Sequence, residues 1–213
     1  MKYMGSKRAM LQNGLGEVLK RQIKGKGRFV DLFSGSGAVA IHVARTSQKP
    51  VVAWDIQEYS AVLANAVIAR QHEFAWRCSW DAWHRRAKKY CRSYRAPSTN
   101  KLTRALVEEI REWCSQRRKL PITRAYGGHY FSARQALQLD ALRATLPTGT
   151  RSRTIALAAL IRAASRCAAA PGHTAQPLQP TRSGKKHVVD AWRKDIFDNT
   201  KSALQQLAMQ YAK

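Results

Sequence analysis

The stretch FVDLFSGSGAVAIHVA, residues 29–44, constrains the fold of this chain more than any other. A short apolar run ends in a turn that contains Gly35 and Gly37, and apolar residues then recur at helical spacing. A second apolar run at 51–54 ends in Asp55, and residues 59–72 have the small apolar side chains of another helix. Strands that alternate with helices in this order predict an α/β fold built on a parallel sheet.

The glycine turn predicts a ligand, and two ligands fit its spacing. Gly35, Gly37 and Ala40 satisfy G-x-G-x-x-A, and Asp55 lies 20 residues after Gly35, so a nicotinamide or flavin dinucleotide is one interpretation. Asp31 disfavours it, because a carboxylate beside the turn would repel a pyrophosphate held at the helix N-terminus. S-adenosylmethionine has no phosphate, and its ammonium and sulfonium would be attracted to Asp31, while Asp55 would accept from its ribose hydroxyls. We therefore expect S-adenosylmethionine, with a purely structural turn as the alternative.

Charge is the strongest global property of the chain. It has 38 Lys and Arg against 13 Asp and Glu, a net charge of +25, and each third of the sequence is net positive. Cations spread through a folded body favour nucleic acid, because they release counterions from phosphates. A merely cationic surface is the alternative, since net charge alone does not specify a partner.

Membrane insertion, export and metal binding have no support in the sequence. No apolar run is long enough to span a bilayer and none follows the charged N-terminus, so we expect a cytoplasmic protein with no membrane partner. The four cysteines lack the spacing of zinc or redox sites. We expect reduced thiols and no metal.

Composition changes after residue 75 and becomes dense in Trp, Tyr and Arg. We interpret this part as a mainly helical insertion with the aromatic side chains in its core. Three segments fit helices, one from Thr103 to about Arg118, one behind an N-cap at Ser132, and one over 153–170. Residues 125–132 predict a tight turn and 188–212 a further helix. The expected domain boundaries are a cofactor-binding part at 1–75, an insertion at 76–185, and a helix returning to the core at 186–213.

The segment KYMGSK at 2–7, followed by DLFSGSG at 31–37, resembles the opening of the Dam-like class of DNA adenine-N6 methyltransferases. The blocks at 126–147 and 163–182 are similar to that class as well. The resemblance implies a partial Rossmann-like S-adenosylmethionine-dependent methyltransferase fold that acts on double-stranded DNA. It implies that the N-terminal segment folds over the cofactor. The expected cofactor-binding residues are Tyr3, Gly5, Ser6, Lys7, Asp31, Phe33, Ser34, Gly35, Gly37, Asp55 and Ile56.

The resemblance also implies that the inserted segment recognises the DNA target. A loop at 126–132 would protrude into a groove or fill the gap left by an extruded adenine, because a base inside a duplex cannot present its amino group. Each candidate contact has the alternative of being an ordinary solvated side chain. The expected DNA-binding residues are Arg124, His129, Tyr130, Arg134, His173, Gln176 and Arg182.

The catalytic segment of that class is missing from this sequence. Its members hold the adenine amino group with an Asp-Pro-Pro-Tyr segment, in which Asn or Ser can replace Asp, and no two of the seven prolines here are adjacent. We therefore assign no catalytic residue in this chain and expect a split methyltransferase whose second subunit carries that segment. The two expected strands alone would also leave an unpaired apolar edge. A truncated, inactive methylase that binds DNA, or a regulatory DNA-binding module with a vestigial nucleotide fold, are the alternatives.

Overall fold

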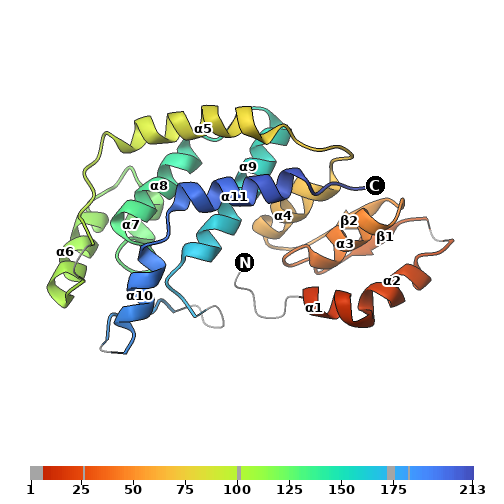
Figure 1. The fold of residues 1–213 in the computed structure, drawn as a ribbon, viewed down its shortest axis with the longest axis horizontal. Helices are drawn as coiled ribbons and strands as arrows, with labels where there is room; N and C mark the ends of the chain where they lie inside the picture. Colours follow the sequence, from red (N-terminus) through yellow and green to blue (C-terminus); the bar gives the residue numbers. More distant parts are fainter. Residues whose placement is uncertain (1–6, 26, 100–101, 172–175, 182) are drawn as a thin grey trace. The chain divides into compact units, whose positions relative to one another are not determined.

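The computed structural model of the chain describes residues 7–25, 27–99, 102–171, 176–181 and 183–213 (Figure 1). These residues divide into two compact units. The sheet unit comprises the described residues from 7 to 76 together with Thr148–Ala159 and Leu204–Lys213. The helical unit comprises the described residues of Arg77–Pro147 and Leu160–Ala203.

Helices dominate the described residues, and the strands are short. In chain order the elements are α1 (Arg8–Met10), the π-helical turn η1 (Leu11–Leu15), α2 (Gly16–Gln22), β1 (Phe29–Asp31), α3 (Ala38–Thr46), β2 (Val51–Ala53), α4 (Glu58–Ile68), α5 (Trp76–Cys91), α6 (Arg104–Ser115), α7 (Pro121–Tyr126), α8 (Ala133–Ala144), α9 (Thr150–Cys167), α10 (Lys185–Trp192) and α11 (Ile196–Ala208).

The sheet unit is an α/β arrangement, as the sequence predicts. β1 and β2 pair in parallel, with Phe29 opposite Val51 and Asp31 opposite Ala53. Parallel neighbours need a crossover connection, and α3 supplies it. α3 packs on both strands and on α4 (Figure 1). Its inner side chains, such as Val43, are buried with Leu63 of α4 in the core of this unit.

A buried arginine fixes the end of the chain in the sheet unit. Arg70 is 4% exposed, and its guanidinium donates to the carbonyl oxygens of His72, Leu207 and Ala208 at 2.7–3.3 Å. A buried guanidinium is tolerated only where its N–H groups are satisfied, and carbonyls at a helix end have no partner within the helix. Arg70 therefore joins the segment after α4 to the C-terminal end of α11.

The helical unit is built around α8, which is buried over most of its length. A helix buried on all sides belongs in the core of a domain. Trp83 of α5 is fully buried and its Nε1 donates to the carbonyl of Leu142 at 3.0 Å. Trp80 is 3% exposed and lies edge-on to Trp83. The prediction that aromatic side chains form this core is confirmed for these two tryptophans.

Helix starts were predictable where a cap precedes them. The Thr103 hydroxyl accepts from Leu106 N at 3.1 Å, and Ser132 and Gln135 form a reciprocal capping box. Two helical parts were not predicted from the sequence: the segment at 8–22, which is distorted at Gly14 (φ 103°), and the short helix α7. The single helix expected at 188–212 is wrong, because the chain forms α10 and α11 with a break between them.

The four cysteines are free thiols, as expected, with Cys114 and Cys167 buried. None of the helices in the described part of the chain combines the length and the apolar character needed to cross a membrane.

Candidate functional site

The glycine turn lies between the carboxyl end of β1 and the start of α3. Gly35 and Gly37 both have positive φ, 50° and 73°. At Gly37 a Cβ atom would lie 3.2 Å from Ile41 Cδ1, in a left-handed backbone conformation that side chains disfavour. In open α/β sheets, ligands bind outside the carboxyl ends of the strands. The turn therefore lies where the fold is suited to hold a ligand.

Asp55 supports this turn from the end of β2. One carboxylate oxygen accepts from Gly35 N at 2.7 Å, and the other accepts from Gln57 N at 2.9 Å. The hydrogen bonds from Gln57 and Gly35 lower the pKa of Asp55. Its carboxylate is therefore ionised at neutral pH, and each oxygen keeps a lone pair for a further donor. The hydrogen bond from Gly35 N to Asp55, across 20 residues, was not predicted from the sequence.

Asp31 ends β1, and its carboxyl group is half-buried. Burial raises its pKa, and the backbone N–H groups of Ala40 and Phe33 oppose this effect. The nearby Asp55 raises the pKa further, whereas Lys7 lowers it. A carboxylate whose charge is destabilised by burial gains most from a cationic neighbour. This electrostatic environment suits a ligand that carries an ammonium or a sulfonium.

Side chains around the turn depart from the usual pattern of burial and hydrogen bonding. Ser34 is 7% exposed, and its hydroxyl is buried with no hydrogen-bond partner among the described residues. Phe33 is 88% exposed and Ile56 is 93% exposed. Buried polar atoms usually have a partner, and large apolar side chains are rarely this exposed. An amphipathic ligand with polar and apolar parts fits this combination.

The structure brings together Asp31, Phe33, Ser34, Gly35, Gly37, Asp55 and Ile56 at the carboxyl ends of the two strands. Lys7 is exposed, precedes α1, and acts on the pKa of Asp31. Tyr3, Gly5 and Ser6 lie outside the described residues. The cofactor-binding role of all these residues stays a prediction.

The turn at 127–131 does not protrude, and this part of the sequence interpretation is wrong. Gly127 and Gly128 are buried, and Arg111 Nε of α6 donates to the carbonyl of Gly128 at 3.0 Å. A Cβ on Gly127 would lie 2.5 Å from Cys114 Sγ. The segment from α7 into this turn is therefore packed against α6.

The predicted DNA-binding residues do not form one cluster. Arg124 is exposed on α7, and His129 and Tyr130 are half-buried in the packed turn. The Tyr130 ring lies edge-on to Tyr126 at 5.8 Å between centroids. Gln176 is exposed in the loop before α10. His173 and Arg182 lie outside the described residues.

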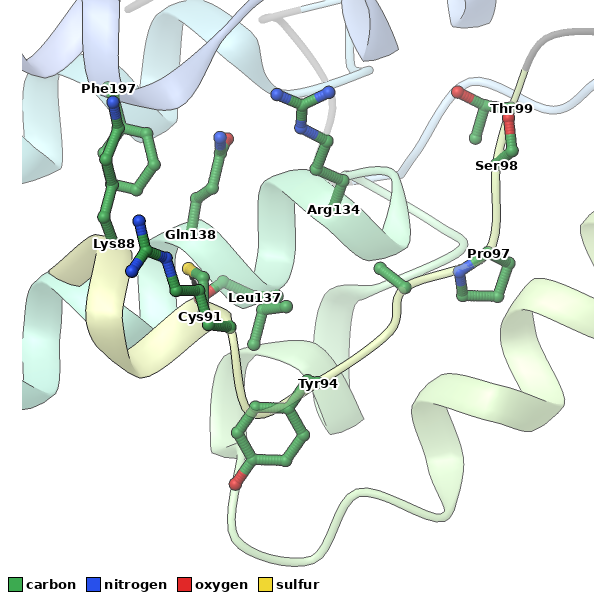
Figure 2. Close-up of a pocket in the computed structure, with 12 residues that line it drawn as sticks. Lys88, Cys91, Tyr94, Pro97, Ser98, Thr99, Arg134, Leu137, Gln138 and Phe197 are labelled. Carbon is green, nitrogen blue, oxygen red and sulfur yellow. Dashed lines mark hydrogen bonds between the residues drawn. The ribbon is translucent and has the colours of Figure 1, made fainter.

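Arg134 belongs to a different group of cations. It lies in the first turn of α8 and lines a pocket together with Lys88 of α5 and Arg92 just after it (Figure 2). Lys88 and Arg92 were not among the residues predicted to bind DNA. The run RRAKKYCRSYR at 85–95, with six cations and no acid, is the signal that could have identified them.

One face of the two-stranded sheet is apolar, and the described residues leave it uncovered. Val30 of β1 and Val52 of β2 are paired in register and are 45% and 42% exposed. Leu32 and Trp54, the next positions on the same face, are 56% and 61% exposed. Parallel sheets are normally covered on both faces. This uncovered face, defined by Val30, Leu32, Val52 and Trp54, is the most unusual apolar surface of the sheet unit.

The edge of β1 away from β2 is also open among the described residues. In the described part of the chain, the sheet consists of the two strands β1 and β2. The backbone carbonyl of Asp31 accepts from Trp54 N, and the backbone N–H of Phe29 donates to the Pro50 carbonyl. Alternate residues of β1 therefore bond to the neighbouring strand. The N–H and C=O of Val30, between them, therefore point to the other edge.

A comparison with protein-family models matches residues 3–116 to the D12 class N6 adenine-specific DNA methyltransferase family. The match includes the glycine turn, both strands and α5 and α6, and it covers just over half of the 213 residues. Searches of curated proteins and of solved structures found no match. The motifs at 2–7 and 31–37 had indicated a methyltransferase of the Dam-like class, and the family match confirms it. The chain therefore belongs to the D12 class N6 adenine-specific DNA methyltransferase family.

Proposed function

We propose that this chain is the S-adenosylmethionine- and DNA-binding subunit of a DNA adenine-N6 methyltransferase whose catalytic segment lies in a second polypeptide. Its family is that of adenine-specific DNA methyltransferases, so adenine in DNA is the acceptor and S-adenosylmethionine the implied donor. The observation that carries the two-subunit proposal is the uncovered apolar face of β1 and β2.

The uncovered face supports a partner because its exposure is costly. Burial of apolar surface contributes roughly 25 cal/mol per Å², so four large side chains left in water forgo several kcal/mol. The unpaired N–H and C=O of Val30 add an edge that can accept another strand. A strand paired to this edge, with helices over Val30 and Val52, would complete an ordinary α/β sheet. We place the strand that carries the Asp-Pro-Pro-Tyr segment here.

The 213 residues have no segment that could take the place of the missing catalytic motif. No Pro-Pro pair occurs, and the acidic stretch at 190–198 contains no proline. In transfer to adenine, a side-chain oxygen and a backbone carbonyl must hold the amino group, and an aromatic ring must stack on the base. We propose that all three come from the partner, and that no catalytic residue belongs to this chain.

We propose that the glycine turn holds the cofactor through this chain's own residues. When bound, S-adenosylmethionine supplies the methyl group. Asp31 would attract the ligand's positive charge, and Asp55 would accept from a hydroxyl with the lone pairs left after its two backbone bonds. The buried Ser34 hydroxyl would gain a partner, while Phe33 and Ile56 would be covered by an apolar part of the ligand. Lys7, with Tyr3, Gly5 and Ser6, would close over it.

We propose further that residues 76–185 are the DNA-recognition insertion of a Rossmann-like domain, between a cofactor-binding part at 1–75 and a helix returning to the core at 186–213. The cations of this segment support the proposal, since residues 76–185 contain 22 of the 38 Lys and Arg and 5 of the 13 Asp and Glu, and such an excess favours a polyanionic partner. The predicted contacts of Arg124, His129, Tyr130, Arg134 and Gln176 stay proposals.

Calorimetry of S-adenosylmethionine binding to the purified chain tests the cofactor part of this proposal. We expect binding at one site without a partner and without DNA, because the turn and both carboxylates belong to this chain. An intact, folded chain that does not bind the cofactor would contradict the proposal, and it would favour a DNA-binding module with a vestigial nucleotide fold.

A further inference from the structure

A pocket of about 520 Å³ lies within the helical unit (Figure 2). Its walls come from the end of α5, from the segment at 92–99 that follows it, and from the first two turns of α8. Figure 2 shows Arg134, Leu137 and Gln138 on the α8 side, with Pro97, Ser98 and Thr99 across from them. The cavity exceeds what a single inorganic ion needs and is within the range of sites for small organic ligands.

Among the described residues that line this pocket, the charged ones are cations, namely Lys88, Arg92 and Arg134. All three are exposed, so the charges are accessible to a ligand from solution. Burial raises the pKa of the Cys91 thiol, which also lines the pocket, to about 11, so at neutral pH the thiol adds no negative charge. The pocket therefore has the charge required by an anionic ligand.

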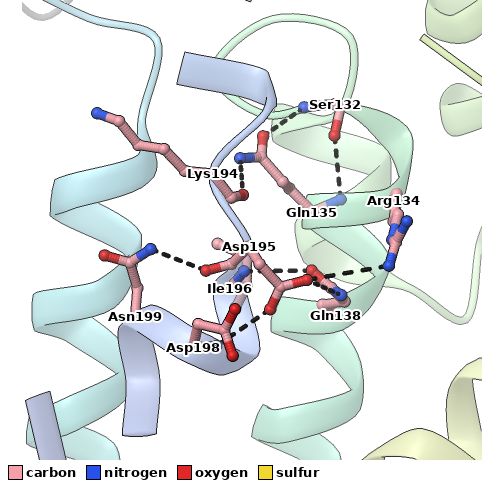
Figure 3. Close-up of polar contacts among 9 residues, drawn as sticks. All are labelled: Ser132, Arg134, Gln135, Gln138, Lys194, Asp195, Ile196, Asp198 and Asn199. Carbon is pink, nitrogen blue, oxygen red and sulfur yellow. Dashed lines mark hydrogen bonds and ion pairs between the residues drawn. The ribbon is translucent and has the colours of Figure 1, made fainter. Parts of the chain in front are cut away.

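The carboxylate of Asp195 lies near this pocket, and its hydrogen bonds are largely used within the protein (Figure 3). Asp195 pairs with Arg134 at 3.9 Å, a long and exposed contact. Its Oδ2 also accepts from Gln138 Nε2 at 3.2 Å, and its Oδ1 accepts from Asp198 N at 3.0 Å, which caps α11. Asp195 therefore reduces the local charge without neutralising Lys88 or Arg92.

The pocket also lies at the end of a longer basic surface. Residues 85–95 contain six cations and no acid, and Arg85, Arg86, Lys88, Lys89, Arg92 and Arg95 are all exposed. The buried side of α5 is Trp80, Trp83 and Ala87, so the cations occupy its solvent side. An extended row of cations suits a polyanion better than an isolated anion, since each phosphate neutralised releases counterions.

We propose that this pocket binds the sugar-phosphate backbone of the DNA substrate, with Lys88, Arg92 and Arg134 each contacting a different phosphate. The proposal rests on the proposed DNA-methyltransferase function and assigns its DNA contacts to α5 and α8 rather than to the packed turn at 127–131. Arginine and lysine are the commonest phosphate ligands, and the hydroxyls of Ser98 and Thr99 add donors of the kind that contact DNA backbones. Leu137 and Pro97 give the attached sugar an apolar surface.

Fluorescence anisotropy with a labelled DNA duplex of random sequence, measured over a range of salt concentrations, tests the proposal. We expect the double variant Arg92→Gln/Arg134→Gln to lower the magnitude of the log-log salt slope by about 2, because each arginine removed leaves one phosphate charge unneutralised, and to weaken binding of all sequences alike. Lys88→Gln, which leaves the Arg134–Asp195 pair intact, should lower the magnitude of the salt slope by about 1. Circular dichroism melts verify that the variants fold.

The matched control is Arg118→Gln/Lys119→Gln, which removes two exposed charges from the same unit outside the pocket. An equal effect of the control and the pocket variants would overturn the pocket assignment and leave the proposed function standing. Adenosine monophosphate that displaces the duplex by binding these same residues would overturn it in favour of a free nucleotide. A wild-type chain that binds the cofactor but no DNA would overturn both proposals.

Discussion

Asp31 and Asp55 both end a strand beside the glycine turn, yet their surroundings differ. Asp55 is stabilised as an anion by two backbone N–H groups, which lower its pKa. Asp31 is half-buried near a second carboxylate, and burial raises its pKa. The two residue types and their spacing were visible in the sequence. Two other features were not visible there: the hydrogen bond from Gly35 N to Asp55, and the buried Ser34 hydroxyl that lacks a partner among the described residues. Both depend on how the turn folds back over β2.

Replacing Asp31 should weaken cofactor binding. Asp31→Asn keeps the size of the side chain and removes its charge, so we expect S-adenosylmethionine to bind about 10- to 100-fold more weakly, the loss of one charge-assisted hydrogen bond. Glu58→Gln is the matched control, since it removes an exposed carboxylate from the first turn of α4 in the same unit. Calorimetry measures both variants. Equal affinities for Asp31→Asn and the wild type would remove Asp31 from the site.

The raised pKa of Asp31 also predicts a pH dependence. The pKa of Asp31 in the folded protein is above the ordinary value of 3.8. The contribution of this group to folding stability is therefore complete at pH values below 3.8, and it is lost as the pH rises through the raised pKa. Cofactor binding has the opposite pH dependence, because only the ionised carboxylate attracts a cation. Cofactor affinity should therefore fall as pH decreases, beginning above the range of an ordinary aspartate. Titrations across acidic pH should show this fall in the wild type and a flatter profile in Asp31→Asn.

Elements with a local start signal were predictable from the sequence. Ser132 caps α8 as expected, and Thr103, where a helix was expected to begin, is the N-cap of α6. A hydroxyl before an apolar repeat needs no tertiary information. The break between α10 and α11 has neither glycine nor proline, and it is stabilised by contacts of Gln135 and Gln138 with residues 191–196 that lie far away in sequence. The pocket between α5 and α8 likewise joins residues more than 40 positions apart.

The packed turn after α7 provides a stability test at this scale. A Cβ at Gly127 would lie 2.5 Å from Cys114 Sγ and 2.6 Å from the Thr123 carbonyl oxygen, so Gly127→Ala must displace α6 or the turn. We expect a loss of about 1–3 kcal/mol in the free energy of unfolding. Gly27→Ala is the control, because a Cβ there meets nothing within 4 Å. Urea unfolding that shows the same stability for both variants would contradict the packing described.

At the scale of the whole molecule, the main properties are the net charge and the uncovered face, and only the charge was predictable from the sequence. The net charge of +25 is plain from composition. The uncovered face required the strand register, because Val30 and Val52 are ordinary apolar residues until their pairing and exposure are known. The missing Pro-Pro pair indicated that something was absent, and the uncovered face indicates where a partner would bind.

A lysine on the uncovered face should prevent the partner from binding. Val52→Lys places a charge where we propose that apolar surface is buried, so we expect association to weaken at least tenfold, while cofactor binding to the chain alone is unchanged. Val18→Lys is the matched control, since Val18 of α2 is 54% exposed in the same unit. Size-exclusion chromatography of each variant mixed with the partner compares the two variants, because a stable complex co-elutes. Equal association of the two variants would exclude this face as the interface.

Transfer of a labelled methyl group from S-adenosylmethionine to adenine in duplex DNA tests the central claim most directly. The reaction is run with this chain alone, and then with the addition of a polypeptide encoded beside it that carries an Asp-Pro-Pro-Tyr segment. We expect no N6-methyladenine from the chain alone and turnover from the mixture. Robust methylation by the 213-residue chain without a partner would contradict the two-subunit account, and a mixture that binds cofactor and DNA without turnover would indicate an inactive methylase.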